Sequence, residues 1–451
     1  MTTPLPRVEL VEPGPAEKAQ RRVAGALRSL GLSPGDRVAF SLHSSADLLV
    51  CVLGAARSGV VPVLLNATLL DDERDLLVAD AEPSFLVQRQ SELAPFLAGD
   101  EREIAPYPLV RPMHYTSGTT GRPKGVWSGV LDDADALALF EDEADLWGFD
   151  ASDTHLVCSP MYHSVSIRLA AASLLRGGRV VVLSRFDPGL AAHALAHHRP
   201  TTTFLAPTAL HRLLSRPDSP ARLDSLRLLI HAGSPCPAAL KRAAFERAPD
   251  GTVWEFYGST EGQFTVCSPE EWVARPGTVG RARPGRSLRV DEEGAVWCTA
   301  PRFARFEYWR DPDATARAWV EDAFSVGDLG RLDDDGFLYL DGRRDDLVIT
   351  GGVNVYPAEV ESVLAEVPGV AEVAVFGMSD PDWGERVCAA VVGAAEKEAL
   401  ARHARSRLAP YKRPKAYFTV ADLPRTATGK LRRRDLPALL GLPSPASHDD
   451  L

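Results

Sequence analysis

Residues 115–125, Tyr-Thr-Ser-Gly-Thr-Thr-Gly-Arg-Pro-Lys-Gly, carry the clearest chemical pattern in the chain. Three glycines and four Ser/Thr hydroxyls leave little for a core to bury, but such a loop can bring backbone N–H groups and hydroxyls against phosphate oxygens. It is not a Walker A loop, which ends in Gly-Lys-Ser/Thr. For an isolated motif the alternative is a flexible Gly/Ser loop. The candidate phosphate-binding residues are Thr116, Ser117, Gly118, Thr119, Thr120 and Lys124.

Further motifs follow in order along the chain. They are Tyr162-His163-Ser164, Tyr257-Gly258-Ser259-Thr260-Glu261, Ser325-Val326-Gly327-Asp328, Gly342-Arg343-Arg344-Asp345-Asp346 and Pro424-Arg425-Thr426-Ala427-Thr428-Gly429-Lys430. Together with the glycine-rich run, they resemble the signature motifs of the adenylate-forming superfamily of acyl-CoA synthetases, peptide-synthetase adenylation domains and luciferases. Residues 231–237, His-Ala-Gly-Ser-Pro-Cys-Pro, are most similar to bacterial fatty-acyl and bile-acid CoA ligases. The resemblance covers almost the whole chain, although the N-terminal segment, the stretch before the loop and residues 290–320 are shorter than usual.

The resemblance implies an ATP-dependent carboxylic acid–CoA ligase with ATP, Mg²⁺ and coenzyme A as cofactors. A carboxylate attacks the α-phosphate of ATP, pyrophosphate leaves, and a thiol then displaces AMP from the acyl-adenylate. Because both steps move negative charge, positioned cations and backbone donors should dominate catalysis. One alternative passes the acyl group to a separate carrier protein or to an amine. A degenerate adenylate-binding protein is the other, and intact Lys124, Glu261, Asp328 and Lys430 argue against it.

The resemblance also implies a role for each motif residue. Thr260 would bind the α-phosphate and Glu261 would bind magnesium, since a hydroxyl beside a carboxylate after an apolar strand suits both tasks. The alternative for Glu261 is a carboxylate at a helix N-terminus. Tyr257 would stack on adenine or simply pack in the core. Asp328 would accept the ribose hydroxyls and Arg343 would contact the ribose or a phosphate; the alternative is a surface pair of these two residues. The remaining candidates for the nucleotide and the pantetheine arm are Gly233, Ser234, Pro235, Gly258, Gly351 and Gly352.

The acid is expected to lack an α-amino group. Amino-acid-activating relatives place Asp after the aromatic residue of the substrate motif, and this chain has His163 there. His163 is interpreted as a positioning or gating residue at the pocket mouth; a lone His is more often structural. The expected pocket walls, which suit fatty, aromatic or polycyclic acids, are Tyr162, Ser166, Ile167, Ala206 and Gly258.

Lys430 lies far along the chain from the phosphate loop, so it can act only if a small domain folds over a large one. The resemblance makes Lys430 the adenylation lysine and Asp345 the hinge that exchanges it for the Gly351-Gly352 face in the thiol step. The alternative is a surface lysine beside the basic run 432–434. This run is expected to be a solvated helix start, and the other interpretation is that it helps to hold a phosphate-rich ligand.

Alternating strand and helix patterns predict an α/β fold. Strands at 37–42, 60–65, 84–87, 180–183, 202–205, 226–230 and 253–256 alternate with helices, which implies parallel sheets covered by helices. Residues 288–340 predict an antiparallel subdomain, and a small mobile α+β domain follows. The predicted domains are 1–344 and 345–440, with 441–451 as a disordered tail; residues 1–14 are expected to be irregular and 89–112 stay undefined.

Composition narrows the partners. The 451 residues carry a net charge of −11 without a long basic tract, which argues against nucleic acid. Six scattered cysteines without a Cys-x-x-Cys pair indicate free thiols in a reducing compartment and no zinc site. No signal peptide or membrane span is evident, so a cytoplasmic enzyme of a small-molecule acid is expected. A homo-oligomer is left open.

Overall fold

The computed structural model describes residues 7–116, 123–216, 222–343, 346–350, 353–380, 384–425 and 431–442. The chain forms two compact units. The first consists of Met1–Leu288 and Cys298–Phe324, and the second of Arg289–Trp297 and Ser325–Leu451. The second unit therefore begins upstream of residue 345, where the sequence predicts a functional hinge; the hinge itself stays a prediction.

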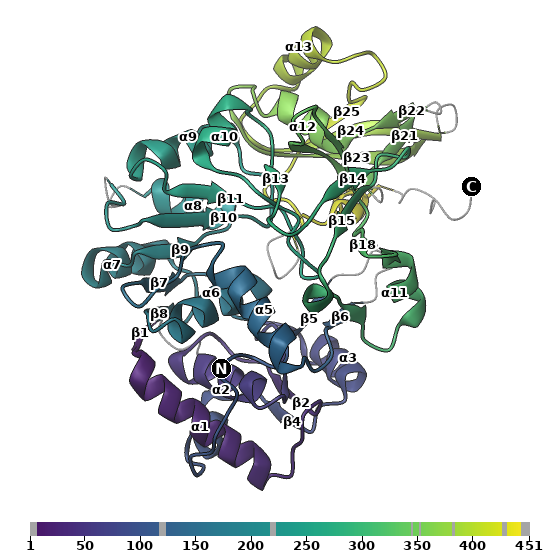
Figure 1. Ribbon diagram of the computed structural model, residues 1–451. Coiled ribbons are helices and arrows are strands. Elements are labelled where there is room, and N and C mark those ends of the chain that lie inside the picture. Colours follow the sequence, from purple (N-terminus) through teal and green to yellow (C-terminus); the bar gives the residue numbers. More distant parts are fainter. Residues whose placement is uncertain are drawn as a thin grey trace. The chain divides into compact units, whose positions relative to one another are not determined.

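The first unit contains two six-stranded sheets (Figure 1). One has the order β16-β6-β5-β3-β2-β4, in which β5, β3, β2 and β4 are parallel, and β6 pairs antiparallel with both β5 and β16. Its strands are β2 (Arg37–Phe40), β3 (Val61–Leu64), β4 (Phe85–Val87), β5 (Met113–Thr116), β6 (Lys124–Trp127) and β16 (Glu307–Tyr308). The apolar runs predicted at 37–42, 60–65 and 84–87 form β2, β3 and β4, and β3 is buried on both faces. Strands β5 and β6, on either side of the predicted phosphate loop, were not predicted.

The second sheet has the order β1-β8-β7-β9-β10-β11. Its strands are β1 (Val8–Val11), β7 (Thr154–Val157), β8 (Arg179–Leu183), β9 (Thr202–Phe204), β10 (Leu228–His231) and β11 (Val253–Glu255). All are parallel except β1, which pairs antiparallel with β8. The expectation that residues 1–14 are irregular is therefore wrong over Val8–Val11, because these residues pair with β8 as an edge strand. It is also wrong from Pro13, where α1 begins.

Helices cover both sheets, and α2 and α6 are largely buried. The helical segments of this unit are α1 (Pro13–Ser29), α2 (Ala46–Arg57), α3 (Asp71–Ala81), η1 (Gln90–Leu93), α4 (Ala94–Leu97), α5 (Asp133–Ala144), α6 (Ser164–Leu175), α7 (Pro188–His198), α8 (Pro207–Leu214), α9 (Ala238–Arg247), α10 (Pro269–Ala274), η2 (Arg302–Ala304) and α11 (Pro312–Ala318). One hydrophobic cluster joins residues of α2 and α6 to residues of both sheets, among them Phe40, Leu49, Ile167 and Val180. A helix that is apolar on all sides, as α2 is, belongs in such a position.

Residues 288–343 form short antiparallel pairs, which confirms the predicted change of sheet type. The strands from residue 265 to residue 343 that belong to neither large sheet are β12 (Thr265–Val266), β13 (Arg281–Ala282), β14 (Leu288–Val290), β15 (Val296–Thr299), β17 (Trp319–Val320), β18 (Ala323–Phe324), β19 (Asp328–Leu332) and β20 (Leu338–Arg343). Acidic turns separate several of them, for example the turn in which Asp333 accepts from Phe337 N–H at 2.8 Å.

The C-terminal part of the second unit is a mixed sheet of β22, β21, β24, β23 and β25 with α12 and α13. The bounds are β21 (Val348–Thr350), β22 (Val353–Val355), α12 (Pro357–Leu364), β23 (Val370–Asp380), β24 (Gly384–Gly393), α13 (Lys397–Arg407), β25 (Ala416–Thr419), η4 (Arg433–Asp435) and α14 (Leu436–Leu439). The predicted tail lies outside the described residues from 443 onward. The expectation that the basic run is solvated is wrong for Arg433, because two carboxylates hold it: Arg433 donates to Glu361 at 2.7 Å and to Asp346 at 3.0 Å.

A buried ion pair connects α9 to the end of β11. Lys241, which is 1% exposed, lies 2.5 Å from Glu255, and its ammonium also lies 4.8 Å from the Trp272 ring centre. Burial raises the pKa of Glu255, and the Lys241 ammonium opposes that rise. All six cysteines are free. Among the described residues, no helix combines the length and the apolar character needed to cross a membrane.

Candidate functional site

Four of the predicted site segments meet at one edge of the second sheet. His163 follows β7, Ala206 follows β9, Gly233 follows β10, and Tyr257 follows β11. These four strands are parallel, so their carboxyl ends share an edge. Ligands of open parallel sheets bind outside this edge. The register of the sheet therefore brings together residues separated by almost one hundred positions of sequence.

Thr260 and Glu261 lie in a tight turn between β11 and β12. Ser259 N–H donates to Gly262 O at 2.8 Å, and Gly258 and Gln263 form an isolated bridge. A Cβ at Gly258 would lie 2.8 Å from Gly262 O, so the turn requires glycine there. The alternative of a helix N-terminus at Glu261 is wrong, because a turn and β12 follow it.

The carboxylate of Glu261 is oriented by a neighbouring strand. Glu261 is 6% exposed, and Tyr308 Oη–H donates to its Oε1 at 2.9 Å. The guanidinium of Arg111 donates to the backbone carbonyl of Thr260 at 2.9 Å and to that of Glu261 at 3.4 Å. Residues outside the turn thus hold both the Glu261 side chain and the turn's backbone. Contacts of this kind keep a ligand-binding carboxylate in one orientation.

The phosphate loop is bounded by the hairpin of β5 and β6. Thr116 and Lys124 are directly opposed in register, and residues 117–122 between them lie outside the described residues, including the predicted Ser117, Gly118, Thr119 and Thr120. The ammonium of Lys124 lies 4.9 Å from the centre of the Tyr308 ring, within cation–π range. Tyr308 therefore contacts both the end of the phosphate loop and Glu261.

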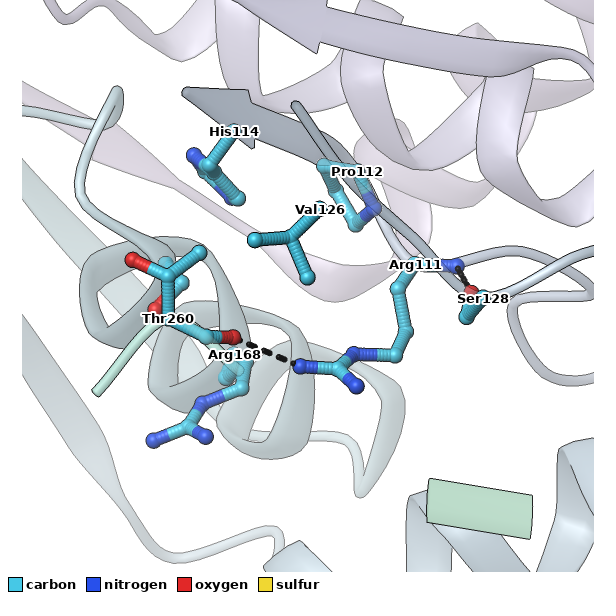
Figure 2. A pocket seen from close by; sticks show the side chains of 8 residues that line it. Arg111, Pro112, His114, Val126, Ser128, Arg168 and Thr260 are labelled. Carbon is cyan, nitrogen blue, oxygen red and sulfur yellow. Dashed lines mark hydrogen bonds between the residues drawn. The ribbon is translucent and has the colours of Figure 1, made fainter. Parts of the chain in front are cut away.

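A small cavity of about 30 Å³ lies next to Thr260 (Figure 2). Its lining residues are Arg111, Pro112, His114, Val126, Ser128, Ser164, Arg168 and Thr260. Among them, only Thr260 has a role predicted from sequence. A signal for Arg168 was present, since it is the one charged residue in the otherwise apolar or small helix 164–175. Arg111 had no comparable signal, because it falls in the undefined segment before β5.

His114 enters this cavity as a neutral imidazole. Burial lowers its pKa to about 3, and Nδ1 lies 2.9 Å from the carbonyl oxygen of Tyr162. A carbonyl oxygen can only accept, so Nδ1 carries the hydrogen and Nε2 is left as an acceptor. His114 thus joins β5 to the motif that precedes α6.

The arginines around the cavity perturb one another. Burial, followed by repulsion from Arg168, lowers the pKa of Arg111 to about 10. Glu143 on α5 shows the converse: burial alone would raise its pKa, but the guanidinium groups of Arg168 and Arg283 outweigh burial and lower it. Perturbed groups of this kind, gathered beside a cavity, are typical of a ligand site.

The predicted acyl-pocket residues occupy α6 and its surroundings. His163 precedes the first residue of α6, and its ring centre lies 4.7 Å from that of Tyr162. Burial raises the pKa of Tyr162. Ile167 belongs to the main hydrophobic cluster, Ser166 is 3% exposed, and Ala206 precedes α8. Their contact with an acid stays a prediction.

The predicted adenine loop follows β10. Gly233 has φ of 92°, and no atom lies within 4 Å of the place that a Cβ would take, so conformation rather than space favours glycine there. Ser234 and Pro235 are exposed. The ring centre of Tyr257 lies 4.8 Å from that of Phe264, and Tyr257 is 9% exposed. This packing agrees with the core-packing alternative, and stacking on adenine stays a prediction.

The remaining predicted residues belong to the second unit. Asp328 begins β19, is 8% exposed, and pairs in register with Arg343 at the end of β20. The two residues are thus neighbours across a hairpin, and their contact with ribose stays a prediction. Asp345, Gly351, Gly352 and Lys430 lie outside the described residues.

Magnesium fits the oriented carboxylate. The described residues contain no group of three or more His, Cys, Asp or Glu side chains that could hold a metal by itself. Magnesium does not need one, because it usually binds one or two carboxylates together with substrate phosphates and water. Glu261, fixed by Tyr308 beside the Thr260 hydroxyl, suits that mode of binding.

Comparison with known proteins gives the family. The family model described as AMP-binding enzyme matches residues 16–108 and 110–299, and the AMP-binding enzyme C-terminal domain matches residues 359–430. The 2-succinylbenzoate–CoA ligase of Bacillus cytotoxicus is 32% identical over 448 residues, which cover 92% of this chain and 90% of that protein.

Two solved structures extend the comparison. The o-succinylbenzoate CoA synthetase (MenE) from Bacillus subtilis, in complex with the acyl-adenylate intermediate OSB-AMP, superposes with a TM-score of 0.82 at 30% identity, covering 93% of this chain and 92% of that one. The amide bond synthetase McbA from Marinactinospora thermotolerans gives a TM-score of 0.82 at 28% identity, covering 94% of each chain. None of these names concerns a fatty acid, so the expectation of fatty acid metabolism gains no support from them. The chain belongs to the AMP-binding family of adenylate-forming enzymes, in its acyl-CoA synthetase branch.

Proposed function

We propose that this protein is an ATP-dependent carboxylic acid–CoA ligase that acts through an acyl-adenylate. The acid's carboxylate oxygen bonds to the α-phosphorus and pyrophosphate leaves. The sulfur of coenzyme A then bonds to the acyl carbon, AMP leaves, and the thiol proton passes to solvent. The observation that carries the proposal is the Thr260–Glu261 turn, held by Arg111 and Tyr308 at the edge where four parallel strands end.

The chain's own residues are proposed to divide the work as follows. Lys124 and the phosphate loop hold the β- and γ-phosphates, Thr260 binds the α-phosphate, and Glu261 holds Mg²⁺. Magnesium bound there would neutralise charge on the phosphate oxygens as pyrophosphate departs. Asp328 accepts the ribose hydroxyls, and Gly233, Ser234 and Pro235 border the adenine.

The two half-reactions are proposed to use two arrangements of a C-terminal lid, residues 345–440, that turns about Asp345. In the first, Lys430 bridges the substrate carboxylate and the α-phosphate, which lowers the cost of bringing two anions together. In the second, Gly351 and Gly352 admit the narrow pantetheine arm, since glycine permits close approach. His163 in place of Asp favours an acid without an α-amino group.

The experiment is pyrophosphate exchange with a panel of acids, followed by mass spectrometry after adding coenzyme A. Acid-dependent exchange and an acyl-CoA product are expected, with Mg²⁺ required. An amine acceptor is the second candidate, favoured by the likeness to McbA. Exchange without thioester, but with an amide when amines are added, would favour that candidate. No exchange with any acid would contradict adenylation altogether.

The six free cysteines support the proposal that the enzyme works in a reducing compartment.

A further inference from the structure

The proposed adenylation lysine belongs to a segment whose two ends are held close together. Lys430 is part of residues 426–430, the lysine loop, which lie outside the described residues. On either side of this loop, Arg425 and Leu431 form an isolated antiparallel bridge, and the amide N–H of the following residue donates to Pro424 O at 2.8 Å. Because the lysine loop is short, the contacts that hold this base limit where Lys430 can lie.

Two arginines attach the base of the lysine loop to β23. Arg425 donates to the Glu372 carboxylate of that strand at 2.8 Å. Arg433 donates from Nε to the carbonyl oxygen of Val375, on the same strand, at 3.2 Å. Leu436 is fully buried in a hydrophobic cluster that includes residues of β23. The chain on both sides of the lysine loop is therefore fixed to one strand.

An ion pair satisfies the outward-facing backbone groups of β23 at Val375. The strand lies at the end of the order β22-β21-β24-β23. Val375 N–H donates to Glu361 Oε1 at 2.7 Å, and the Arg433 guanidinium donates to both oxygens of Glu361 at 2.7 Å. Together with the bond from Arg433 to Val375 O, one Glu–Arg pair satisfies both backbone groups of a buried residue.

The same guanidinium also contacts the chain beside the proposed hinge. Arg433 donates to Asp346 Oδ2 at 3.0 Å, and Asp346 directly follows Asp345. The side chains of this cluster are mostly buried, with Arg433 19% and Asp346 22% exposed. Burial would lower the pKa of Arg433, but the carboxylates of Glu361 and Asp346 outweigh burial and raise it. Charge-assisted hydrogen bonds of this kind are the strong ones, so Arg433 is suited to hold distant segments together.

The engagement of Arg433 distinguishes it within the basic run 432–434. All three of its guanidinium nitrogens donate to groups of the protein. These contacts do not support the interpretation that Arg433 holds a phosphate-rich ligand. Arg432, by contrast, is 56% exposed and pairs only locally, with Asp435 at 2.9 Å. Arg433 is thus placed to act on the reaction through other residues rather than by touching a substrate.

We propose that Arg433 is a positioning residue for the adenylation half-reaction, which joins the chain beside the proposed hinge to the base of the lysine loop. A turn at Asp345 would then carry Lys430 to one fixed place. The inference rests on the proposed function, since it takes Lys430 as the adenylation lysine. The thioester half-reaction should not need this link, because the proposed Gly351-Gly352 face follows β21, which pairs directly with β24 in the sheet.

The test compares the two half-reactions in one set of variants. Pyrophosphate exchange measures adenylation, and conversion of supplied acyl-adenylate and coenzyme A to thioester measures the second step. Arg433→Met should lower kcat for exchange about 10- to 100-fold, the loss expected when a catalytic group is slightly misplaced, while thioester formation changes less than about threefold. Arg433→Lys keeps the charge but loses the planar fork, so its exchange rate should lie between those of Arg433→Met and the wild type.

Two further variants separate positioning from folding. Arg432→Met is the matched control from the same basic run, and both of its half-reactions should match the wild type. Asp346→Asn removes one charged partner without truncating Arg433, and it should also lower exchange selectively. The double variant Arg433→Met, Asp346→Asn should lose no more exchange than Arg433→Met alone, because residues that act through one contact are not additive. Should Arg433→Met fail to fold, Asp346→Asn and Arg433→Lys carry the same test.

The contrary outcomes are distinct. Equal loss of both half-reactions in folded Arg433→Lys and Asp346→Asn would show a merely structural role and overturn the inference. Full exchange in Arg433→Met, while Lys430→Ala abolishes exchange, would overturn it and leave the proposed function standing. Exchange that survives Lys430→Ala would refute the proposed adenylation lysine, and the inference with it.

Discussion

The phenol of Tyr308 donates a hydrogen bond of 2.9 Å to Oε1 of Glu261. Tyr308 is the last residue of β16, the strand that pairs with β6 immediately after the phosphate loop. Its ring also lies 4.9 Å from the ammonium of Lys124. One side chain thus connects the proposed phosphate and magnesium positions, although the three residues span nearly two hundred positions of sequence.

Glu261→Gln tests the magnesium assignment. The amide keeps the shape of the side chain and its oxygen can still accept from Tyr308, but the negative charge is lost. Pyrophosphate exchange should fall on the order of 100-fold or more, the loss typical when a charge-stabilising group is removed. The melting temperature without nucleotide should stay unchanged. Full exchange activity in this variant would rule out Glu261 as the magnesium ligand.

Tyr308→Phe is the matched control for orientation. It removes the hydroxyl and keeps the ring beside Lys124. A neutral-to-charged hydrogen bond contributes about 1.5–3 kcal/mol, so the Mg²⁺ concentration needed for half-maximal exchange should rise while saturating Mg²⁺ restores most of kcat. A drop in kcat that Mg²⁺ cannot rescue would point to a role other than positioning.

Lys430→Ala and Asp345→Pro separate the two half-reactions. If Lys430 bridges carboxylate and α-phosphate, its loss should abolish adenylate formation while supplied acyl-adenylate and coenzyme A still yield thioester. Proline at 345 removes φ freedom from the proposed hinge and should do the reverse. The measurements are exchange for the first step and thioester formation for the second. Equal losses in both steps for Lys430→Ala, or none, would refute the two-state assignment.

Ionisation of Glu143 is expected to make part of the free energy of unfolding depend on pH. Its pKa in the folded protein lies below the ordinary glutamate value of 4.5, so ionised Glu143 stabilises the fold above pH 4.5. This contribution is lost as pH falls through the lowered pKa. Glu143→Gln should reduce the free energy of unfolding at neutral pH, and its difference from wild type should shrink in acid. Chemical unfolding at several pH values measures this. Glu141→Gln, on the exposed face of α5, should show no such difference. A constant Glu143→Gln difference at all pH values would contradict the assignment.

Lys241→Met should destabilise the first unit. Removing the ammonium leaves Glu255 buried without its partner at 2.5 Å, and loss of one member of a buried pair typically costs 3–5 kcal/mol, so about that loss is expected in urea unfolding. The double variant Lys241→Met, Glu255→Met should recover much of it, because both buried charges are then gone. A double variant that is less stable than Lys241→Met would show that the pair contributes more than mutual neutralisation.

Strands and helices could be predicted from the sequence where a short segment carries its own hydrophobic pattern. The predicted strands 60–65 and 226–230 are short apolar runs that form β3 and β10, and the predicted alternation with helices holds at α2, which apolar residues fill and Ser45 caps. Val8–Val11 escaped prediction because an edge strand depends on a partner, here β8, that lies far away in the sequence. Helix α6 was not predicted, because its small and apolar residues show no amphipathic period and, unlike α2, no side chain caps its start.

The sequence by itself determined the family and the motifs that are expected to carry the chemistry, because the glycine-rich loop, the Thr260–Glu261 pair and the later motifs depend on residue type and local spacing. Only the tertiary structure decided what surrounds them. Tyr308, Arg111 and Arg168 come from separate elements, and no local spacing relates them to Glu261 or Thr260. Strand pairing brings Tyr308 beside Lys124, and helix packing brings Arg168 beside Thr260. These contacts are decided by the packing of elements that lie far apart in the sequence, so residue type and local spacing do not predict them.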